Sequence, residues 1–199
     1  MTERVGFGKR FGASMIDGIV GSIGGMILGA VFGGLLGGAV AAEAGAASGE
    51  AGAAEVAGAL GGVFGAFAGA IVGIAFAGVI IAVWEACTGA AIGKMALGIK
   101  IKSADGSPAS FGKRLVRSLF KYNAQVLGVL TVLTGIEALE SVGNIGMFVM
   151  AIGCLLVLGG EKQALHDKLA GTAVYPKDAT SAVDHATSAV DQIQENLEG

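Results

Sequence analysis

Residues 18–42 read GIVGSIGGMILGAVFGGLLGGAVAA and contain no charged side chain. Glycine recurs at every fourth position of this stretch, at Gly21, Gly25, Gly29, Gly33 and Gly37. In a soluble helix each of these glycines would cost about 1 kcal/mol relative to alanine. In a bilayer the backbone must satisfy its own hydrogen bonds, which favours a helix, and small residues let two helix backbones approach closely. The stretch therefore predicts a membrane-spanning helix with one face suited to packing.

A second stretch, residues 56–84, has the same character. It is uncharged and carries glycines at the same spacing, at Gly61, Gly65, Gly69 and Gly73. As a helix it would be about 43 Å long, which exceeds the hydrocarbon core of about 30 Å, so it must tilt or project. The two glycine ladders could pair within one chain, join two copies of the chain, or contact a larger membrane complex.

The composition also indicates a membrane protein. Of the 199 residues, 53% are hydrophobic and only 15% are charged, whereas soluble proteins carry about 25% charged residues. The mean hydropathy is +0.72. The first apolar stretch is longer than the apolar region of a secretory signal peptide, about 7–15 residues, so we expect it to remain as a membrane helix.

Four spans account for the distribution of charge. The expected spans are residues 10–42, 56–84, 119–136 and 141–160. All 13 Lys and Arg residues then lie on one side of the membrane. The loops on the other side carry Glu43, Glu50, Glu55, Glu137 and Glu140. The positive-inside rule places both termini in the cytoplasm, whereas three spans would leave the last three lysines outside.

The segment between the second and third expected spans is basic. Residues 99–102 alternate apolar and basic side chains like a strand, and we expect them to pair with residues 172–175 in a small cytoplasmic sheet. A helix capped by Ser107 or Ser110 follows, with an apolar face opposite a basic face. We expect the basic face to contact anionic lipid headgroups through Lys113, Arg114, Arg117 and Lys121. Because the segment lies between spans, nucleic acid is not expected as a partner.

The last residues form a separate tail. We divide the chain into a membrane domain, residues 1–176, and an acidic tail, residues 177–199. Apolar residues in the tail follow heptad spacing opposite an acidic side. The tail is either a docking helix for another copy or another protein, or a solvated segment.

The sequence carries no arrangement typical of an enzyme. The spacing from Gly89 to Gly93 and Lys94 is one residue too short for a phosphate-binding loop. The cysteines, Cys87 and Cys154, fit small core residues, and the histidines are too isolated for a metal site. We therefore expect neither enzymatic activity nor a metal or other cofactor.

Several short motifs resemble the RDD family of bacterial membrane proteins and occur in the family's order. They are KRF and MIDG within residues 9–18, the pattern TG…GK…LGIKI…DG within residues 88–106, the arginine pair of residues 114–117, and HDKLAGTAV at residues 166–174. The resemblance covers about residues 7–175. The glycine ladders and the tail lie outside the motifs and indicate a specialised member.

The resemblance also points to particular residues. The family name refers to one arginine and two aspartates, which match Arg10, Asp17 and Asp167, while Lys94 and Asp105 match other motif positions. The resemblance implies a location in the bacterial inner membrane. Transport, including sodium–proton exchange, has been suggested for the family.

Asp17 is the sharpest candidate for a functional residue. A carboxylate within an apolar helix is costly and would suit proton-coupled cation exchange. The structural alternative is that Asp17 accepts hydrogen bonds from Arg10, from a helix end or from neighbours of Asp167. Because Arg10 and Asp17 lie about 10.5 Å apart along a helix axis, a direct pair between them is awkward, and we expect a third group to bind Asp17.

These observations predict an all-α integral membrane protein, a four-span glycine-rich helical bundle with a small cytoplasmic β element and an amphipathic C-terminal tail. The leading functional hypothesis is a non-enzymatic structural or accessory subunit in the lipid bilayer. It would assemble through its glycine faces and tail into a homo-oligomer or a larger membrane protein complex. The alternative is a small cation/proton transporter that uses Asp17.

Overall fold

The structure, a computed structural model, describes residues 3–178 and 193–194. Its elements are α1 (Phe7–Ala47), α2 (Ala53–Thr88), α3 (Ile92–Ala96), β1 (Ile99–Ser103), α4 (Phe111–Lys121), α5 (Asn123–Thr134), α6 (Ala138–Cys154), the 3-10 helix η1 (Leu155–Leu158), α7 (Leu165–Leu169) and β2 (Thr172–Pro176). The expected tail lies outside the described residues except for positions 177, 178, 193 and 194.

The chain divides into two compact units, each described here by itself. The sheet unit comprises Met1–Asp17, Ile81–Asn123 and Asn144–Gly199. The hairpin unit comprises Gly18–Ile80 and Ala124–Gly143. Long helices therefore contribute to both units, while the small sheet belongs to one of them.

Three helical segments within the described residues are long and apolar enough to cross a membrane. They are Phe7–Ala47, Ala53–Thr88 and Ala138–Leu158. The span expected over residues 119–136 is divided in the structure, because the chain leaves helical geometry at Tyr122 (φ −107°, ψ 24°). Residues 119–121 end α4, and α5 has only 12 residues. At 1.5 Å per residue α5 is about 18 Å long, too short to cross the hydrocarbon core alone.

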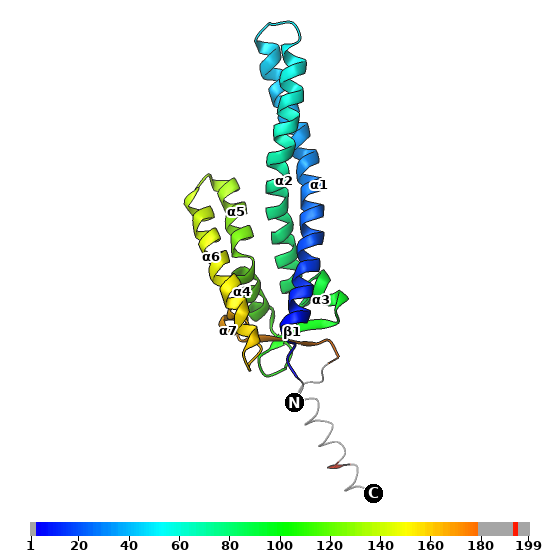
Figure 1. Ribbon diagram of the computed structural model, residues 1–199, viewed down its shortest axis with the longest axis vertical. Helices are drawn as coiled ribbons and strands as arrows, with labels where there is room; N and C mark the ends of the chain where they lie inside the picture. The colour runs from blue at the N-terminus through cyan, green and yellow to red at the C-terminus, as the bar shows by residue number, and fades with distance from the viewer. Residues whose placement is uncertain (1–2, 179–192, 195–199) are drawn as a thin grey trace. The chain divides into compact units, whose positions relative to one another are not determined.

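Helices α1 and α2 lie side by side as an antiparallel hairpin (Figure 1). Both helices are longer than the spans expected from the sequence. The connection between them occupies residues 48–52, whereas the sequence predicted a loop over residues 43–55. The short connection is possible because Gly49 and Gly52 adopt positive φ angles of 73° and 78°, a conformation that glycine adopts without steric cost.

Four glycines of each ladder face those of the other ladder within this hairpin. Gly25 lies opposite Gly73, and the pairing continues through Gly29 with Gly69, Gly33 with Gly65 and Gly37 with Gly61. A methyl group placed on Gly25 would lie 2.6 Å from the carbonyl oxygen of Gly73, well inside van der Waals contact. The structure thus uses the ladders inside one chain, while their use between chains stays a prediction.

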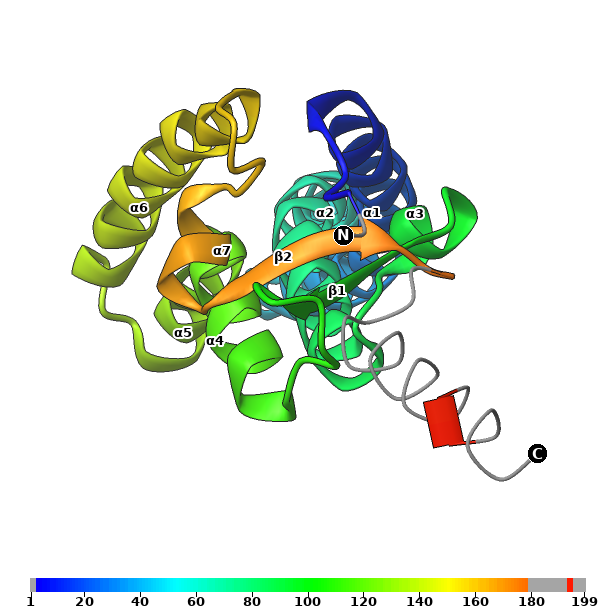
Figure 2. The same ribbon diagram turned by 90° about the horizontal axis from the view of Figure 1, so that it is seen from below.

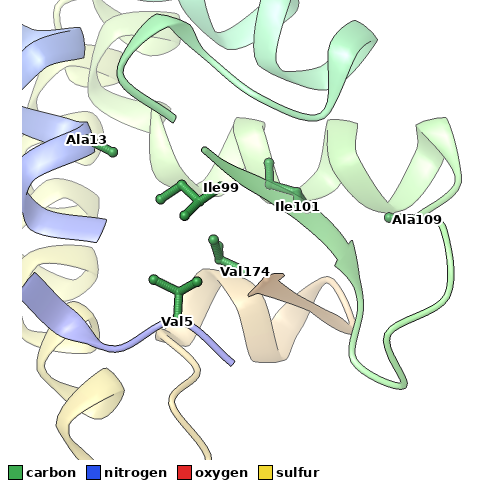
Figure 3. Packing of buried hydrophobic residues seen from close by; sticks show 6 residues of the cluster. All are labelled: Val5, Ala13, Ile99, Ile101, Ala109 and Val174. Atoms are coloured by element: carbon green, nitrogen blue, oxygen red, sulfur yellow. The ribbon is translucent and has the colours of Figure 1, made fainter. Parts of the chain in front are cut away.

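The sheet unit contains the expected two-stranded sheet. Strands β1 and β2 pair antiparallel with Ile101 opposite Val174 (Figure 2), which confirms the pairing of residues 99–102 with residues 172–175. The N-terminal segment joins them, because the backbone N–H of Val5 donates to the carbonyl of Val174 at 2.9 Å. Figure 3 shows the apolar cluster around the strands, which is formed by Val5, Ala13, Ile99, Ile101, Ala109 and Val174.

The hairpin contact gives the first testable prediction. Replacing Gly29 or Gly33 with leucine should lower the free energy of unfolding by about 1–3 kcal/mol, because the larger side chain must force the two backbones apart. Thermal unfolding in a mild detergent measures the effect. The matched control is Gly24→Leu in the same helix, where a side chain would meet open space. Equal melting temperatures for Gly33→Leu and Gly24→Leu would contradict the close contact.

Candidate functional site

Charged side chains gather in the interior of the sheet unit. Glu85 of α2, Lys94 of α3, Arg117 of α4 and Asp167 of α7 are each at most 3% exposed. Such residues are almost never fully buried unless they are paired. These four residues, with Arg10 and Lys121, form the cluster called here the ion-pair network.

Asp167 connects the beginning of α1 to α7. Its Oδ2 accepts a hydrogen bond from Arg10 Nη1 at 2.5 Å and its Oδ1 accepts one from Arg117 Nε at 2.6 Å. Oδ2 also accepts from the backbone N–H of Ala164 at 3.2 Å and so caps the first turn of α7. Burial raises the pKa of Asp167, but the charges of Arg117 and Arg10 outweigh it and hold this pKa below its usual range.

Glu85 forms the other acidic centre of the network. It accepts hydrogen bonds from Lys94 Nζ at 2.6 Å and from Lys121 Nζ at 3.2 Å. It also accepts a short hydrogen bond from Arg117 Nη1. Arg117 therefore bridges Glu85 and Asp167. Burial lowers the pKa of Arg117, but the two carboxylates raise it more, so the guanidinium stays charged.

Asp17 lies apart from the pair formed by Arg10 and Asp167. Its side chain is 4% exposed, and Oδ1 accepts a hydrogen bond from the backbone N–H of Gly93 at 2.6 Å, in the first turn of α3. A side chain on Gly93 would overlap the carbonyl group of Ala13, so glycine is required for this approach of α3 to α1. Asp17 Oδ2 has no hydrogen-bond partner. The geometry corresponds to the helix-end alternative.

The exposed basic face expected for α4 does not include Arg117, which is buried against the carboxylates of Glu85 and Asp167. Lys121 likewise directs its Nζ to Glu85 and to the hydroxyl of Tyr122. Lys113 is exposed and Arg114 is half-buried, so for these two the headgroup contact stays a prediction. The apolar side chains Phe111, Val116, Leu119 and Phe120 are exposed instead. Helix α4 thus turns Arg117 and Lys121 inward and leaves apolar side chains exposed, which suits an apolar surrounding.

Asp105 does not belong to the network. It lies exposed in the turn after β1, where its Oδ1 accepts hydrogen bonds from the backbone N–H and the hydroxyl of Ser107 at 3.0 and 2.6 Å. The hydroxyl group holds the pKa of Asp105 below its ordinary value. Of the five motif positions, the structure therefore brings Arg10, Lys94 and Asp167 into one network and leaves Asp17 and Asp105 outside it.

The sequence analysis missed two residues of this site. Glu85 was detectable as the only carboxylate between Glu55 and Asp105, directly beside a basic segment. His166 is 4% exposed, and its Nε2 lies 3.3 Å from Arg117 Nη2. A guanidinium only donates, so Nε2 accepts and the ring proton is on Nδ1. Burial, followed by the charge of Arg117, lowers the pKa of His166 to about 3.

The site has the chemistry of a structural network. Its carboxylates are saturated by cations, which makes them poor nucleophiles or bases. Within the part of the chain that the structure describes, no group of three or more His, Cys, Asp and Glu residues is placed to hold a metal ion. The ion pairs join residues up to 157 positions apart in the sequence.

Comparison with known proteins identifies one family. A model of the RDD family matches residues 4–171 of the chain. Searches of curated proteins and of solved structures give no match.

The network predicts a large effect of removing one charge. Asp167→Asn should lower the free energy of unfolding by about 3–5 kcal/mol, because it leaves the half-buried Arg10 and the buried Arg117 without their shared carboxylate. The control is Glu161→Gln, which removes an exposed pair with Lys168 and should cost less than about 1 kcal/mol. Denaturation in detergent compares the two variants. Similar losses would contradict a dominant role for the buried pair.

His166 predicts a stability that depends on pH. Its pKa of about 3 in the folded protein lies below the value of about 6.5 expected when unfolded. The unfolded chain binds more protons between these values, so the free energy of unfolding should fall by about 1.4 kcal/mol per pH unit as the pH drops below about 6.5. Asp167 adds its own loss only below about pH 4.

Melting temperatures measured from pH 6.5 to 4.5 isolate the contribution of His166. The slope should be smaller in His166→Asn than in the wild type. Lys168→Gln, in the same helix and exposed, should keep the wild-type slope because lysine does not titrate in this window. An unchanged slope in His166→Asn would contradict the assignment.

Proposed function

The chain belongs to the RDD family, and from this premise we propose that it is a non-enzymatic structural or accessory subunit of a membrane protein assembly. The observation that carries the proposal is that the arginine and the two aspartates denoted by the family name all make structural contacts within the chain. Arg10 and Asp167 bind each other across 157 positions of sequence, and Asp17 accepts a backbone hydrogen bond from α3. All three hold separate segments of the chain together.

The outward faces of the long helices support embedding and assembly. Leu35 and Leu36 of α1 and Phe64, Phe67 and Ile71 of α2 are 67% to 72% exposed. Apolar side chains of this size are stable against lipid or against another apolar subunit, and costly in water. The hairpin therefore offers a surface on which a homo-oligomer or a larger complex would assemble.

The distribution of charge supports a topology with both termini in the cytoplasm of a bacterium. All 13 Lys and Arg residues fall within the sheet unit, and the hairpin unit has none. Strand β1 follows the second expected span, β2 follows the fourth, and the two strands pair with each other. The pairing supports an even number of crossings between β1 and β2, as in the four-span hypothesis. The short α5 would then require a thinned or partly crossed membrane.

One observation favours the alternative, a cation/proton transporter. The buried Oδ2 atom of Asp17 has no partner, and a free carboxylate oxygen in an apolar helix is a candidate proton or cation ligand. Against it, Asp17 is the one carboxylate in α1 between Phe7 and Ala42. A relay of further acids, as ion pathways require, is not visible along that stretch of the helix.

The mass and subunit composition of the particle extracted in a mild detergent test the leading proposal. We expect an assembly of several chains, either copies of this protein or this protein with other membrane subunits. A monomeric particle that shows cation-driven proton movement in liposomes would overturn the proposal and support the transporter.

Variants of Asp17 distinguish the accessory subunit from the transporter, because they change the two carboxylate oxygens of this residue separately. Asp17→Asn retains the Oδ1 acceptor for Gly93, so the particle and its stability should be preserved, whereas Asp17→Ala should cost about 1–3 kcal/mol by leaving that N–H unpaired. Light scattering and thermal unfolding measure both variants. A wild-type cation flux that Asp17→Asn abolishes, with an intact particle, would favour the transporter instead.

A further inference from the structure

The sheet unit contains a cavity of about 380 Å³ next to the ion-pair network. Its polar lining consists of Arg10, Ser14, Lys94, Arg117, Lys121 and His166. Four of these side chains are cations, and the carboxylates that pair with them, Glu85 and Asp167, do not line the cavity. Most of the lining is apolar, and its smaller polar part consists of hydrogen-bond donors and positively charged groups.

The charges around the cavity are not balanced. Arg10, Lys94, Arg117 and Lys121 share the two carboxylates of the network. When Asp17, which lies outside the network, is also counted, four basic side chains stand against three carboxylates. Buried charge without compensation is costly, so an anion in the cavity would be stabilised. Burial, opposed by Glu85 but assisted by the charges of Lys121 and Arg117, lowers the pKa of Lys94 to about 7. Lys94 is therefore only partly charged at neutral pH, and an anion in the cavity would favour its charged form.

His166 supplies an independent indication of a ligand. Its Nδ1 atom is buried and has no hydrogen-bond partner. Because Nε2 accepts from Arg117, Nδ1 carries the proton and is an unsatisfied donor in a residue that lines the cavity. Buried donors are almost always paired. An anion with several acceptor oxygens would satisfy this group together with the cations.

The remaining walls of the cavity are apolar. Phe7 and Phe11 of α1 stack with their ring centroids 5.6 Å apart, and Leu155 and Val157 of η1 also line it. Phe11 and Leu155 are each 54% exposed, so the apolar wall continues to the outer surface of two helices suited to lipid. A free inorganic ion would leave this wall without a partner.

We propose that the cavity binds the phosphate head of an anionic lipid, with its acyl chains directed along Phe11 and Leu155. The two guanidinium groups, two ammonium groups and one imidazole N–H match the several oxygens of a phosphate better than the two of a carboxylate. The site goes beyond the proposed accessory role, because an accessory subunit needs no bound lipid.

The two cysteines provide a direct test in the wild-type protein. Cys154 lines the cavity, whereas Cys87 is exposed and does not. Purified protein in a neutral detergent is treated with N-ethylmaleimide, and both cysteines are quantified in the same sample by peptide mass spectrometry. Dihexanoyl phosphatidic acid should slow the modification of Cys154 about tenfold near saturation and leave that of Cys87 unchanged. Phosphatidylcholine of the same chain length should protect neither.

Two further arms identify the source of the anion and the groups that bind it. Inorganic phosphate should give no protection, and protection equal to that of phosphatidic acid would overturn the lipid assignment. Lys94→Met should weaken protection about tenfold, the effect of losing one charge-assisted contact. Lys113→Met, which changes an exposed lysine outside the cavity, should not weaken it. Equal protection by the two lipids, or none by either, would overturn the proposal whether or not Lys94→Met folds.

Discussion

The guanidinium of Arg117, held between the carboxylates of Glu85 and Asp167, is the interaction on which the sheet unit depends. Glu85 lies near the end of α2 and Asp167 in α7, so one side chain of α4 connects helices that are distant in sequence. A buried ion pair adds little stability over an apolar core, but loss of one partner leaves a costly unpaired charge. The network therefore specifies which segments meet more than it adds to the total stability.

The hairpin unit is held by the opposite means. Its contact contains no charge and almost no side chain, because the glycines of α1 and α2 place backbone against backbone. In lipid the hydrophobic effect does not drive two apolar helices together, so close packing has to do so. The protein thus combines ion pairs in a unit that contains all its basic residues with close packing in a unit that contains none.

Helix α4 shows what a periodic sequence pattern can predict and what it cannot. The spacing of apolar and basic residues over 111–121 predicted a two-faced helix, and the structure contains it. The pattern does not say which face turns inward, because that depends on the surrounding medium. Arg117 and Lys121 turn toward Glu85, and Phe111 and Phe120 are exposed. In a soluble protein the apolar face of such a helix would be buried and the basic face exposed.

Local features of the sequence determined the apolar helices, the strand pair and the family, since each follows from spacing along a few residues. Tertiary structure decided the partners. Arg10 and Asp17 are close in sequence, yet Arg10 binds Asp167 and Asp17 binds Gly93. The three cations that bind Glu85 are likewise brought to it by the fold. The sequence pattern also did not indicate that α4 ends at Tyr122. A charge buried in a low-dielectric interior takes whichever partner the fold brings within reach, and sequence spacing does not encode that distance.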